Sequence, residues 1–210
     1  MRQGISRFGR RVDPEYRSLV VVDMAGSGRW NDRVQLRARA ALDSMVRTAF
    51  RGISRHRLVI EDRGDGMIVL IPPTVSKVDL FDPLIPRLAA ALRDHNSTVE
   101  PRIRLRVAVH AGEVLHGRAG WVGTDLNLAC RLVNSPPLYR ELTCRPHADL
   151  ALIVSDTIHQ AVVRHGHRGI DPADYRPVHV AVKEVETRAW LFTPLPAPRP
   201  VTLVPRVVPA

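Results

Sequence analysis

Short apolar runs separated by glycine or proline turns recur along the chain, and their lengths are typical of strands. Residues 19–23 form one such run, and residues 58–60 and 67–71 flank a short glycine-containing turn. Two apolar runs around a tight glycine turn predict a β-hairpin. Residues 103–109 alternate arginine with apolar side chains, which predicts a strand with one solvated face.

Helical spacing of apolar residues marks the segments between these strands. The clearest case begins at Asn31 or Asp32, either of which can cap a helix, and continues to about residue 53. Further helices are expected over residues 82–95, 125–133 and 156–165, and further strands over residues 150–154, 178–183 and 188–192. The order strand, helix, strand, strand, helix, strand predicts an α+β fold that begins as a ferredoxin-like, split βαβ arrangement.

The length of 210 residues allows one well-cored domain and is too short for two of full size. We expect an arginine-rich N-terminal arm over residues 1–17, one domain over residues 18–193 and a flexible, proline-rich tail over residues 194–210. The first residues lack an apolar signal core, and no run approaches the roughly 20 apolar residues of a membrane span. We therefore expect a cytoplasmic protein that does not bind a membrane.

The formal charge of +10 changes this picture little. The basic residues are almost all arginine, since Lys77 and Lys183 are the only lysines, and this bias is typical of a GC-rich genome. No basic run is interleaved with aromatic residues, as a surface for single-stranded nucleic acid would require. We expect no nucleic-acid partner, although the charge favours a polyphosphate substrate. Cys130 and Cys144 lack a CxxC spacing and are expected to be reduced thiols.

Two aspartates in glycine-rich settings are the strongest candidates for chemistry. Asp65 lies in the hairpin turn, and Asp23 ends the first apolar run and precedes the glycine-rich residues 24–28. In a split βαβ sheet these two positions lie side by side, so the carboxylates would converge as a two-metal site requires. The backbone amides of the glycine-rich residues suit phosphate binding. Aspartate is also common in turns, which leaves a structural role open.

Asn127 and Arg131 lie four residues apart on an expected helix and therefore share one face. Such a face could meet a reacting phosphoryl group. The alternative is a pair of solvated helix residues, which an arginine-rich chain supplies easily.

Four segments of the sequence resemble the catalytic domain of class III nucleotidyl cyclases, the adenylate and guanylate cyclase family, in its bacterial stand-alone form. They are VVDMAG at residues 21–26, EDRGDGM at 61–67, RVAVHAGEV at 106–114 and GTDLNLACRL at 123–132. The third is similar to the family's GIHTGEV strand and turn, and the fourth to its GxxVNxAxRL helix. The resemblance extends over residues 19–192 and implies a palm fold with a ferredoxin-like core, its sheet flanked by helices.

The resemblance implies a role for each candidate residue in converting a nucleoside triphosphate to a 3′,5′-cyclic nucleotide. Asp23 and Asp65, with Met24, would hold two Mg²⁺ or Mn²⁺ ions per active site. Asn127 would orient the ribose, and Arg131 would stabilise the charge that develops at the α-phosphorus. The triphosphate would be bound by Ala25, Gly26, Ser27 and Lys183.

The positions that read the base in the family are unusual in this chain. Glu61 stands where guanylate cyclases have glutamate and many adenylate cyclases have lysine, but it could also be a strand-end charge. Gly120 occupies the second position, where aspartate accompanies adenine and cysteine accompanies guanine, and Trp121 beside it could stack on a base or block it. The base therefore stays open. Stand-alone bacterial cyclases that make cyclic pyrimidine nucleotides in antiviral signalling are similar in outline.

The resemblance also implies a head-to-tail homodimer in which one chain supplies the metal aspartates and the other supplies Asn127 and Arg131. A second hypothesis is a non-catalytic cyclase-homology module that binds nucleotide or a protein partner. A diguanylate cyclase would need a Gly-Gly-Asp/Glu-Glu-Phe turn, which residues 63–67 do not supply. The hypothesis of a nucleic-acid-binding module is supported by the net charge alone.

Overall fold

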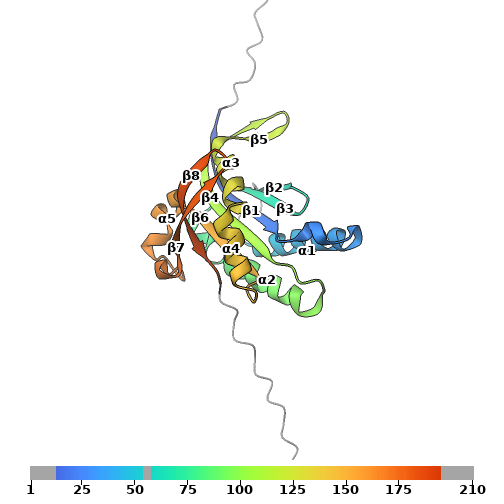
Figure 1. Ribbon diagram of the computed structural model, residues 1–210. Helices are drawn as coiled ribbons and strands as arrows, with labels where there is room; N and C mark the ends of the chain where they lie inside the picture. Colours follow the sequence, from blue (N-terminus) through green and yellow to red (C-terminus); the bar gives the residue numbers. More distant parts are fainter. Residues whose placement is uncertain (1–12, 54–57, 195–210) are drawn as a thin grey trace, which may run out of the picture.

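A computed structural model describes residues 13–53 and 58–194, and its centre is a mixed sheet of eight strands (Figure 1). The strand order is β2-β3-β1-β4-β6-β8-β7, with β5 paired to β4. The strands are β1 (Glu15–Met24), β2 (Val59–Asp62), β3 (Gly66–Ile71), β4 (Leu105–Gly117), β5 (Gly120–Val122), β6 (Leu150–Ser155), β7 (Arg176–Val182) and β8 (Val185–Phe192). Only the pairing of β4 with β6 is parallel among these strands of the described chain.

The first four strands have the ferredoxin-like order that the sequence predicts. β1 lies between β3 and β4 and is antiparallel to both, while β2 forms the edge beyond β3. A nearly continuous apolar run suits this central place because both faces of the strand are covered. The α+β fold with a split βαβ core is thereby confirmed.

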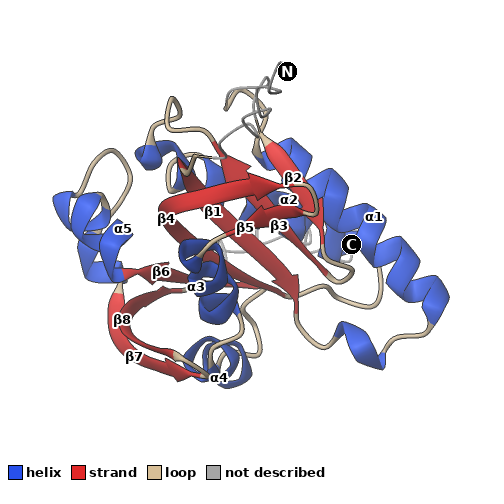
Figure 2. Ribbon diagram, turned by 90° about the horizontal axis from the view of Figure 1, so that it is seen from above, coloured by secondary structure: helices blue, strands red, loops and turns tan. Residues whose placement is uncertain are grey.

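Helices cover both faces of the sheet (Figure 2). They are α1 (Asp32–Ala49), α2 (Leu84–Thr98), α3 (Thr124–Val133), α4 (Pro136–Cys144) and α5 (Asp156–Ala161), with short 3-10 turns at Ser27–Arg29, Lys77–Leu80, Val163–His165 and Pro172–Asp174. Side chains of α1, α2 and α5 share one apolar core with Val20 and Val22, and side chains of α3 and α4 share another with Leu19 and Val21. The alternation of β1 therefore serves two cores at once.

Local capping explains where two of the helices begin. Asn31 Oδ1 accepts a hydrogen bond from the Val34 amide at 3.0 Å, which places the start of α1 where the sequence predicts it. Ser155 Oγ accepts one from the Ile158 amide at 3.3 Å and begins α5. None of the helices in the described ranges is both long and apolar enough to cross a membrane.

The structure extends or adds elements where the apolar pattern is weak. β1 begins at Glu15, so the last residues of the expected N-terminal arm belong to the sheet. β4 continues to Gly117 because its second half pairs with the start of β1 and with β5. Helix α4, which the sequence analysis did not identify, begins at Pro136, and proline is well suited to the first helical position.

A buried histidine fastens α3 to the sheet. His110 of β4 is 2% exposed; its Nδ1 lies 2.8 Å from Ser155 Oγ and its Nε2 lies 3.0 Å from Asp125 Oδ1. The other oxygen of Asp125 accepts a hydrogen bond from the Glu113 amide at 2.8 Å. These contacts fix the first turn of α3, the helix that carries Asn127, against β4.

The same contact explains a glycine in β4. A Cβ atom added to Gly112 would lie 2.0 Å from Cγ of Asp125, closer than any real contact. The absence of a side chain at this position therefore lets the carboxylate reach both His110 and the strand.

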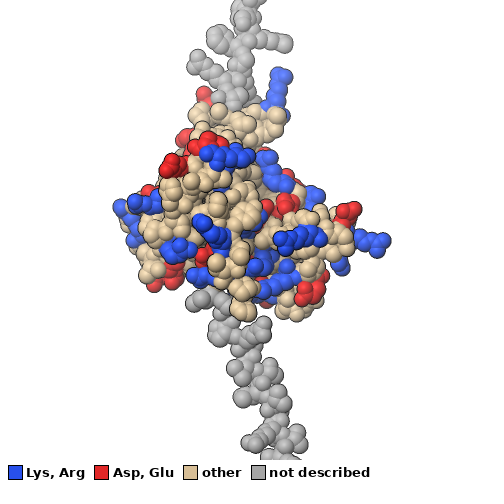
Figure 3. All heavy atoms as spheres, in the orientation of Figure 1, with Lys and Arg blue, Asp and Glu red and all other residues tan. Residues whose placement is uncertain are grey.

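Charged side chains are dispersed over the surface. Arginine and lysine atoms are scattered among acidic ones over the face shown in Figure 3 and do not gather in a single patch there. Dispersal of this kind reduces repulsion between like charges in a strongly basic chain.

We expect Gly112→Ala to destabilise the protein by about 1–3 kcal/mol, because the added methyl group displaces Asp125 and breaks its hydrogen bonds. Urea unfolding followed by circular dichroism measures the change. Gly28→Ala is the matched control, since a Cβ atom there would meet no atom within 4 Å. Equal stability of the two variants would contradict the role assigned to the contact.

Candidate functional site

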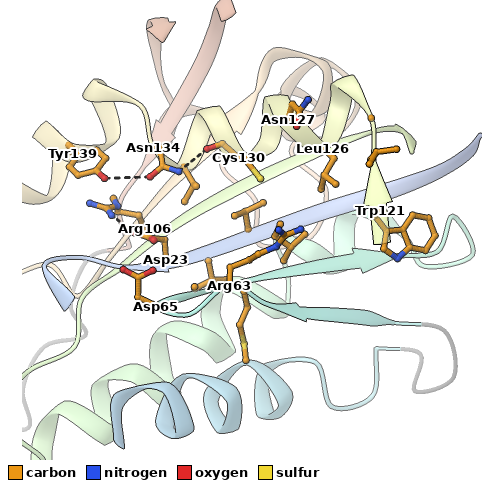
Figure 4. A pocket seen from close by; sticks show the side chains of 18 residues that line it. Asp23, Arg63, Asp65, Arg106, Trp121, Leu126, Asn127, Cys130, Asn134 and Tyr139 are labelled. Atoms are coloured by element: carbon orange, nitrogen blue, oxygen red, sulfur yellow. Dashed lines mark hydrogen bonds and ion pairs between the residues drawn. The ribbon is translucent and has the colours of Figure 1, made fainter. Parts of the chain in front are cut away.

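A cavity of about 600 Å³ opens between the ends of β1 and β3 and the helices α3 and α4. Figure 4 shows Asp23, Asp65, Arg106 and Tyr139 gathered at one end and Trp121 at the other. Asn127 of α3 also lines the cavity. Strands and helices that are distant in the sequence thus bring four of the predicted site residues to one cavity: Asp23, Asp65, Trp121 and Asn127.

The two candidate metal ligands converge as predicted. Asp23 lies opposite Gly66 in the β1–β3 ladder, and Gly66 directly follows Asp65 in the sequence. The Met24 amide donates a hydrogen bond to the Asp65 carbonyl at 2.9 Å, which ties the hairpin turn to the end of β1. A Cβ atom on Gly66 would lie 2.6 Å from the Val22 carbonyl oxygen, so a glycine is needed for this close approach.

Burial and charge act on Asp23 in opposite directions. Burial raises the pKa of its carboxyl group above the ordinary value, the neighbouring Arg106 guanidinium opposes this, and the negative charge of Asp65 adds to the increase. Arg106 donates a hydrogen bond to Asp23 Oδ2. Asp65 accepts one from the Ser27 hydroxyl at 2.6 Å.

The donor set suits Mg²⁺ or Mn²⁺. Among the residues that the structure describes, no three His, Cys, Asp or Glu side chains gather as a self-sufficient metal cage. Mg²⁺ is usually held by one or two carboxylates together with water and substrate phosphate oxygens. Asp23 and Asp65 are two hard oxygen ligands of this kind, and a cationic side chain already lies against one of them. The residues present therefore fit the expected ions.

The glycine-rich loop is only partly available to phosphate. The Ala25 amide donates a hydrogen bond to the Arg104 carbonyl at 2.8 Å. This N–H is therefore not available to a phosphate group, although Ala25 was expected to bind one. Gly26 has a φ of 78°, a left-handed conformation that favours glycine and turns the chain into a 3-10 helix beginning at Ser27. The amides of Gly26 and Ser27 remain the candidates.

The Asn127 and Arg131 pair lies on α3 as predicted, but the two side chains meet different groups. Asn127 lines the cavity, whereas Arg131 Nε bonds to Glu184 Oε1 at 3.1 Å. Glu184 follows Lys183 in the turn between β7 and β8, where Lys183 has a φ of 50°. Neither Arg131 nor Lys183 is among the lining residues of this cavity.

The two positions expected to read the base, 59 residues apart in the sequence (61 and 120), are neighbours in space. A Cβ atom on Gly120 would lie 3.5 Å from Glu61 Oε1, and the other oxygen of Glu61 accepts a hydrogen bond from Arg63 at 2.6 Å. Arg63 and Trp121 both line the cavity beside them. The acceptor that the sequence identifies in Glu61 thus comes with an adjacent donor in Arg63.

Arg106 and Cys130 are two of the lining residues that were not identified as site residues from the sequence. Arg106 was assigned with Arg104 to a solvated strand face, but α4 covers that face: Arg104 donates to the Leu142 and Arg145 carbonyls, and Arg106 is 6% exposed. Cys130 is the second. Burial raises the pKa of its thiol, while Arg63 and Arg131 oppose the increase.

Comparison with known proteins gives matches in structure but none in sequence. The sequence matches no protein-family model and no curated protein. An adenylate/guanylate cyclase/hydrolase from Silicibacter pomeroyi superimposes with a TM-score of 0.64 at 19% identity, covering 88% of this chain and 99% of that chain.

Two further neighbours come from rhodopsin-linked cyclases. The catalytic core of a rhodopsin-guanylyl cyclase with converted specificity, in complex with ATPαS, has a TM-score of 0.55 at 16% identity over 86% of this chain and 96% of its own. A non-canonical dimeric guanylyl cyclase domain of the RhoGC fusion protein from Blastocladiella emersonii has a TM-score of 0.53 at 14% identity over 87% and 97%. The chain therefore has the fold of class III adenylate/guanylate cyclase catalytic domains.

Proposed function

We propose that the protein is a nucleotidyl cyclase that converts a nucleoside triphosphate to a 3′,5′-cyclic nucleotide and pyrophosphate. The observation that carries the proposal is the convergence of Asp23 and Asp65 on adjacent strands, at the edge of a cavity that Asn127 also lines. The fold of cyclase catalytic domains supports it. Placing two carboxylates side by side is unfavourable without a cation, and Asp23 is in addition partly desolvated.

The side chains divide the work of the reaction. Asp23 and Asp65, with the Met24 carbonyl, would hold two Mg²⁺ or Mn²⁺ ions, which when bound polarise the 3′-hydroxyl and the α-phosphate and neutralise the leaving pyrophosphate. The 3′-hydroxyl loses its proton to solvent, and its oxygen forms a bond to the α-phosphorus while the bond from that phosphorus to the α–β bridging oxygen breaks and pyrophosphate leaves. Asn127 orients the ribose for this in-line attack.

Charge on the triphosphate is met by groups at the rim of the cavity. The Gly26 and Ser27 amides donate to phosphate oxygens. Arg131 and Lys183 supply positive charge at the α-phosphorus and the triphosphate, and we infer that they come from a second copy of the chain. Neither residue lines the cavity that holds the aspartates of its own chain, which supports a head-to-tail homodimer in which the partner completes the site.

The base that is cyclised stays open among guanine, adenine and a pyrimidine. Glu61 would accept a hydrogen bond from the base, and the neighbouring Arg63 would donate one to it. Trp121, which lines the cavity, would provide a surface on which the base can stack. A cyclic pyrimidine product would connect the protein with antiviral signalling by stand-alone bacterial cyclases.

The second candidate is a cyclase-homology module that binds nucleotide without turnover. One observation favours it: Arg131 pairs with Glu184 and Asp23 pairs with Arg106, so two residues of the catalytic set have oppositely charged partners within the chain.

Turnover is tested by incubating the protein with ATP, GTP, CTP and UTP in Mn²⁺ and identifying products by mass spectrometry. We expect one nucleotide to give a 3′,5′-cyclic product, and Asp65→Ala to lower the rate at least about 10²-fold because a metal ligand is lost. Asp62→Ala is the matched control in the same turn, since Asp62 bonds to Arg39 and the Gly64 amide away from the cavity. Folded wild-type protein that releases no product from any nucleotide would favour the binding module.

Sharing of the site is tested by mixing two inactive variants, Asp65→Ala and Arg131→Ala. In a head-to-tail dimer half of the dimers are mixed and each mixed dimer has one intact site, so activity should return to about a quarter of the wild-type value. Each variant mixed with wild type serves as a control for exchange of subunits. If the mixture stays as inactive as its components although exchange occurs, the site is complete within one chain.

Occupancy of the cavity is tested through its cysteine. Cys144 is exposed and Cys130 is half-buried with a raised thiol pKa, so iodoacetamide at pH 7.5 should alkylate Cys144 first. A bound nucleoside triphosphate should slow labelling of Cys130 further and leave Cys144 unchanged, as measured by peptide mass spectrometry. Equal labelling of Cys130 with and without nucleotide would argue against binding in this cavity.

A further inference from the structure

Arg106 is the cavity residue that the proposed chemistry leaves without a role. Its side chain is 8% exposed, and its guanidinium donates a hydrogen bond to Asp23 Oδ2. The guanidinium carbon lies 3.7 Å from the centre of the Tyr139 ring, within the range of a cation–π contact. Its Nε atom is buried and has no hydrogen-bond partner among the described residues. The side chain is thus held in place by the carboxylate and the ring.

The local charges explain why a cation lies there. Burial raises the pKa of Asp23, and the negative charge of Asp65 adds to that increase. A buried carboxylate of this kind needs a counter-ion. Arg106 supplies it, so the three side chains together carry one negative charge instead of two.

A guanidinium and a divalent cation cannot both occupy the inner side of Asp23. Two positive groups on the same carboxylate oxygen repel each other, and the repulsion is stronger where the carboxylate is partly desolvated, as Asp23 is. A metal ion that binds Asp23 through Oδ2 must therefore displace the hydrogen bond from Arg106.

We propose that Arg106 is a built-in counter-ion that competes with divalent cations for Asp23, and that Tyr139 holds it in the competing position. The proposal rests on the proposed metal role of Asp23 and Asp65. Arg106 is then a determinant of metal affinity. It stabilises the charged, ordered aspartates before a metal ion binds, and it weakens the binding of that ion.

The alternative is that Arg106 only fastens β4 to the end of β1, where it lies opposite Asp23 in the ladder. That alternative predicts a loss of stability on substitution and no gain in metal affinity. Competition predicts a gain in metal affinity whatever happens to stability.

The test is Mn²⁺ binding without nucleotide, measured at pH 8 by electron paramagnetic resonance of free Mn²⁺. The variants are Arg106→Gln and, as a charge-matched control, Arg63→Gln, which removes a cavity arginine that pairs with Glu61 instead of Asp23. We expect Arg106→Gln to tighten Mn²⁺ binding about tenfold or more, and Arg63→Gln to change it by less than about threefold. Thermal melting establishes that each variant is folded.

Tyr139→Leu is a second variant that keeps both charges and changes a partly exposed ring. We expect it to tighten Mn²⁺ binding about two- to threefold, because the guanidinium loses its support. This variant keeps the proposal testable if Arg106→Gln does not fold.

Unchanged or weaker Mn²⁺ binding in folded Arg106→Gln would overturn the competition. Asp65→Asn distinguishes this result from failure of the proposed function. If Asp65→Asn in the otherwise wild-type chain abolishes Mn²⁺ binding, the metal site is supported and only the competition by Arg106 is wrong. If neither wild type nor Arg106→Gln binds Mn²⁺ more tightly than Asp65→Asn, both the metal site and the competition are wrong.

Discussion

The register of β1 between its two neighbours is the constraint on which the site depends. On one side Asp23 pairs with Gly66, which brings Asp65 next to it; on the other side it pairs with Arg106. A slip of one residue would turn Asp23 toward the opposite core, because side chains alternate between faces. The apolar residues before Asp23 prevent such a slip, since each is committed to one of the two cores. Packing of the strand thus determines the electrostatics at its end.

A second set of contacts controls the opposite wall of the cavity. His110 connects Asp125, in the first turn of α3, with Ser155, which caps α5. The helix that presents Asn127 is therefore held by a polar network inside the sheet layer as well as by its apolar face. A buried network of this kind is favourable only when every member has its partner, so it specifies one orientation of α3.

The sequence predicts the parts of the structure that follow from local chemistry. The apolar runs and the glycine turn sufficed for the ferredoxin-like order and for the convergence of Asp23 and Asp65. Arg106 was misassigned because alternation along a strand cannot distinguish a face covered by water from one covered by a helix. The helix that covers it, α4, has a short apolar pattern that begins with two prolines and was missed. The ion pair of Arg131 with Glu184 depends on the path of the β7–β8 turn, which no local pattern encodes.

Gly120 has an evolutionary consequence. Its φ of 110° lies in a region that side chains rarely adopt, and a Cβ atom there would approach Glu61. In the family that the sequence resembles, this position carries an aspartate or a cysteine. A point mutation to either would strain the β4–β5 turn of this chain, so drift toward those familiar substrate preferences is blocked by the backbone. If the protein acts on a nucleotide as proposed, a lineage with this turn would change its preference through other side chains, of which Glu61 lies next to Gly120 and Arg63 and Trp121 line the cavity.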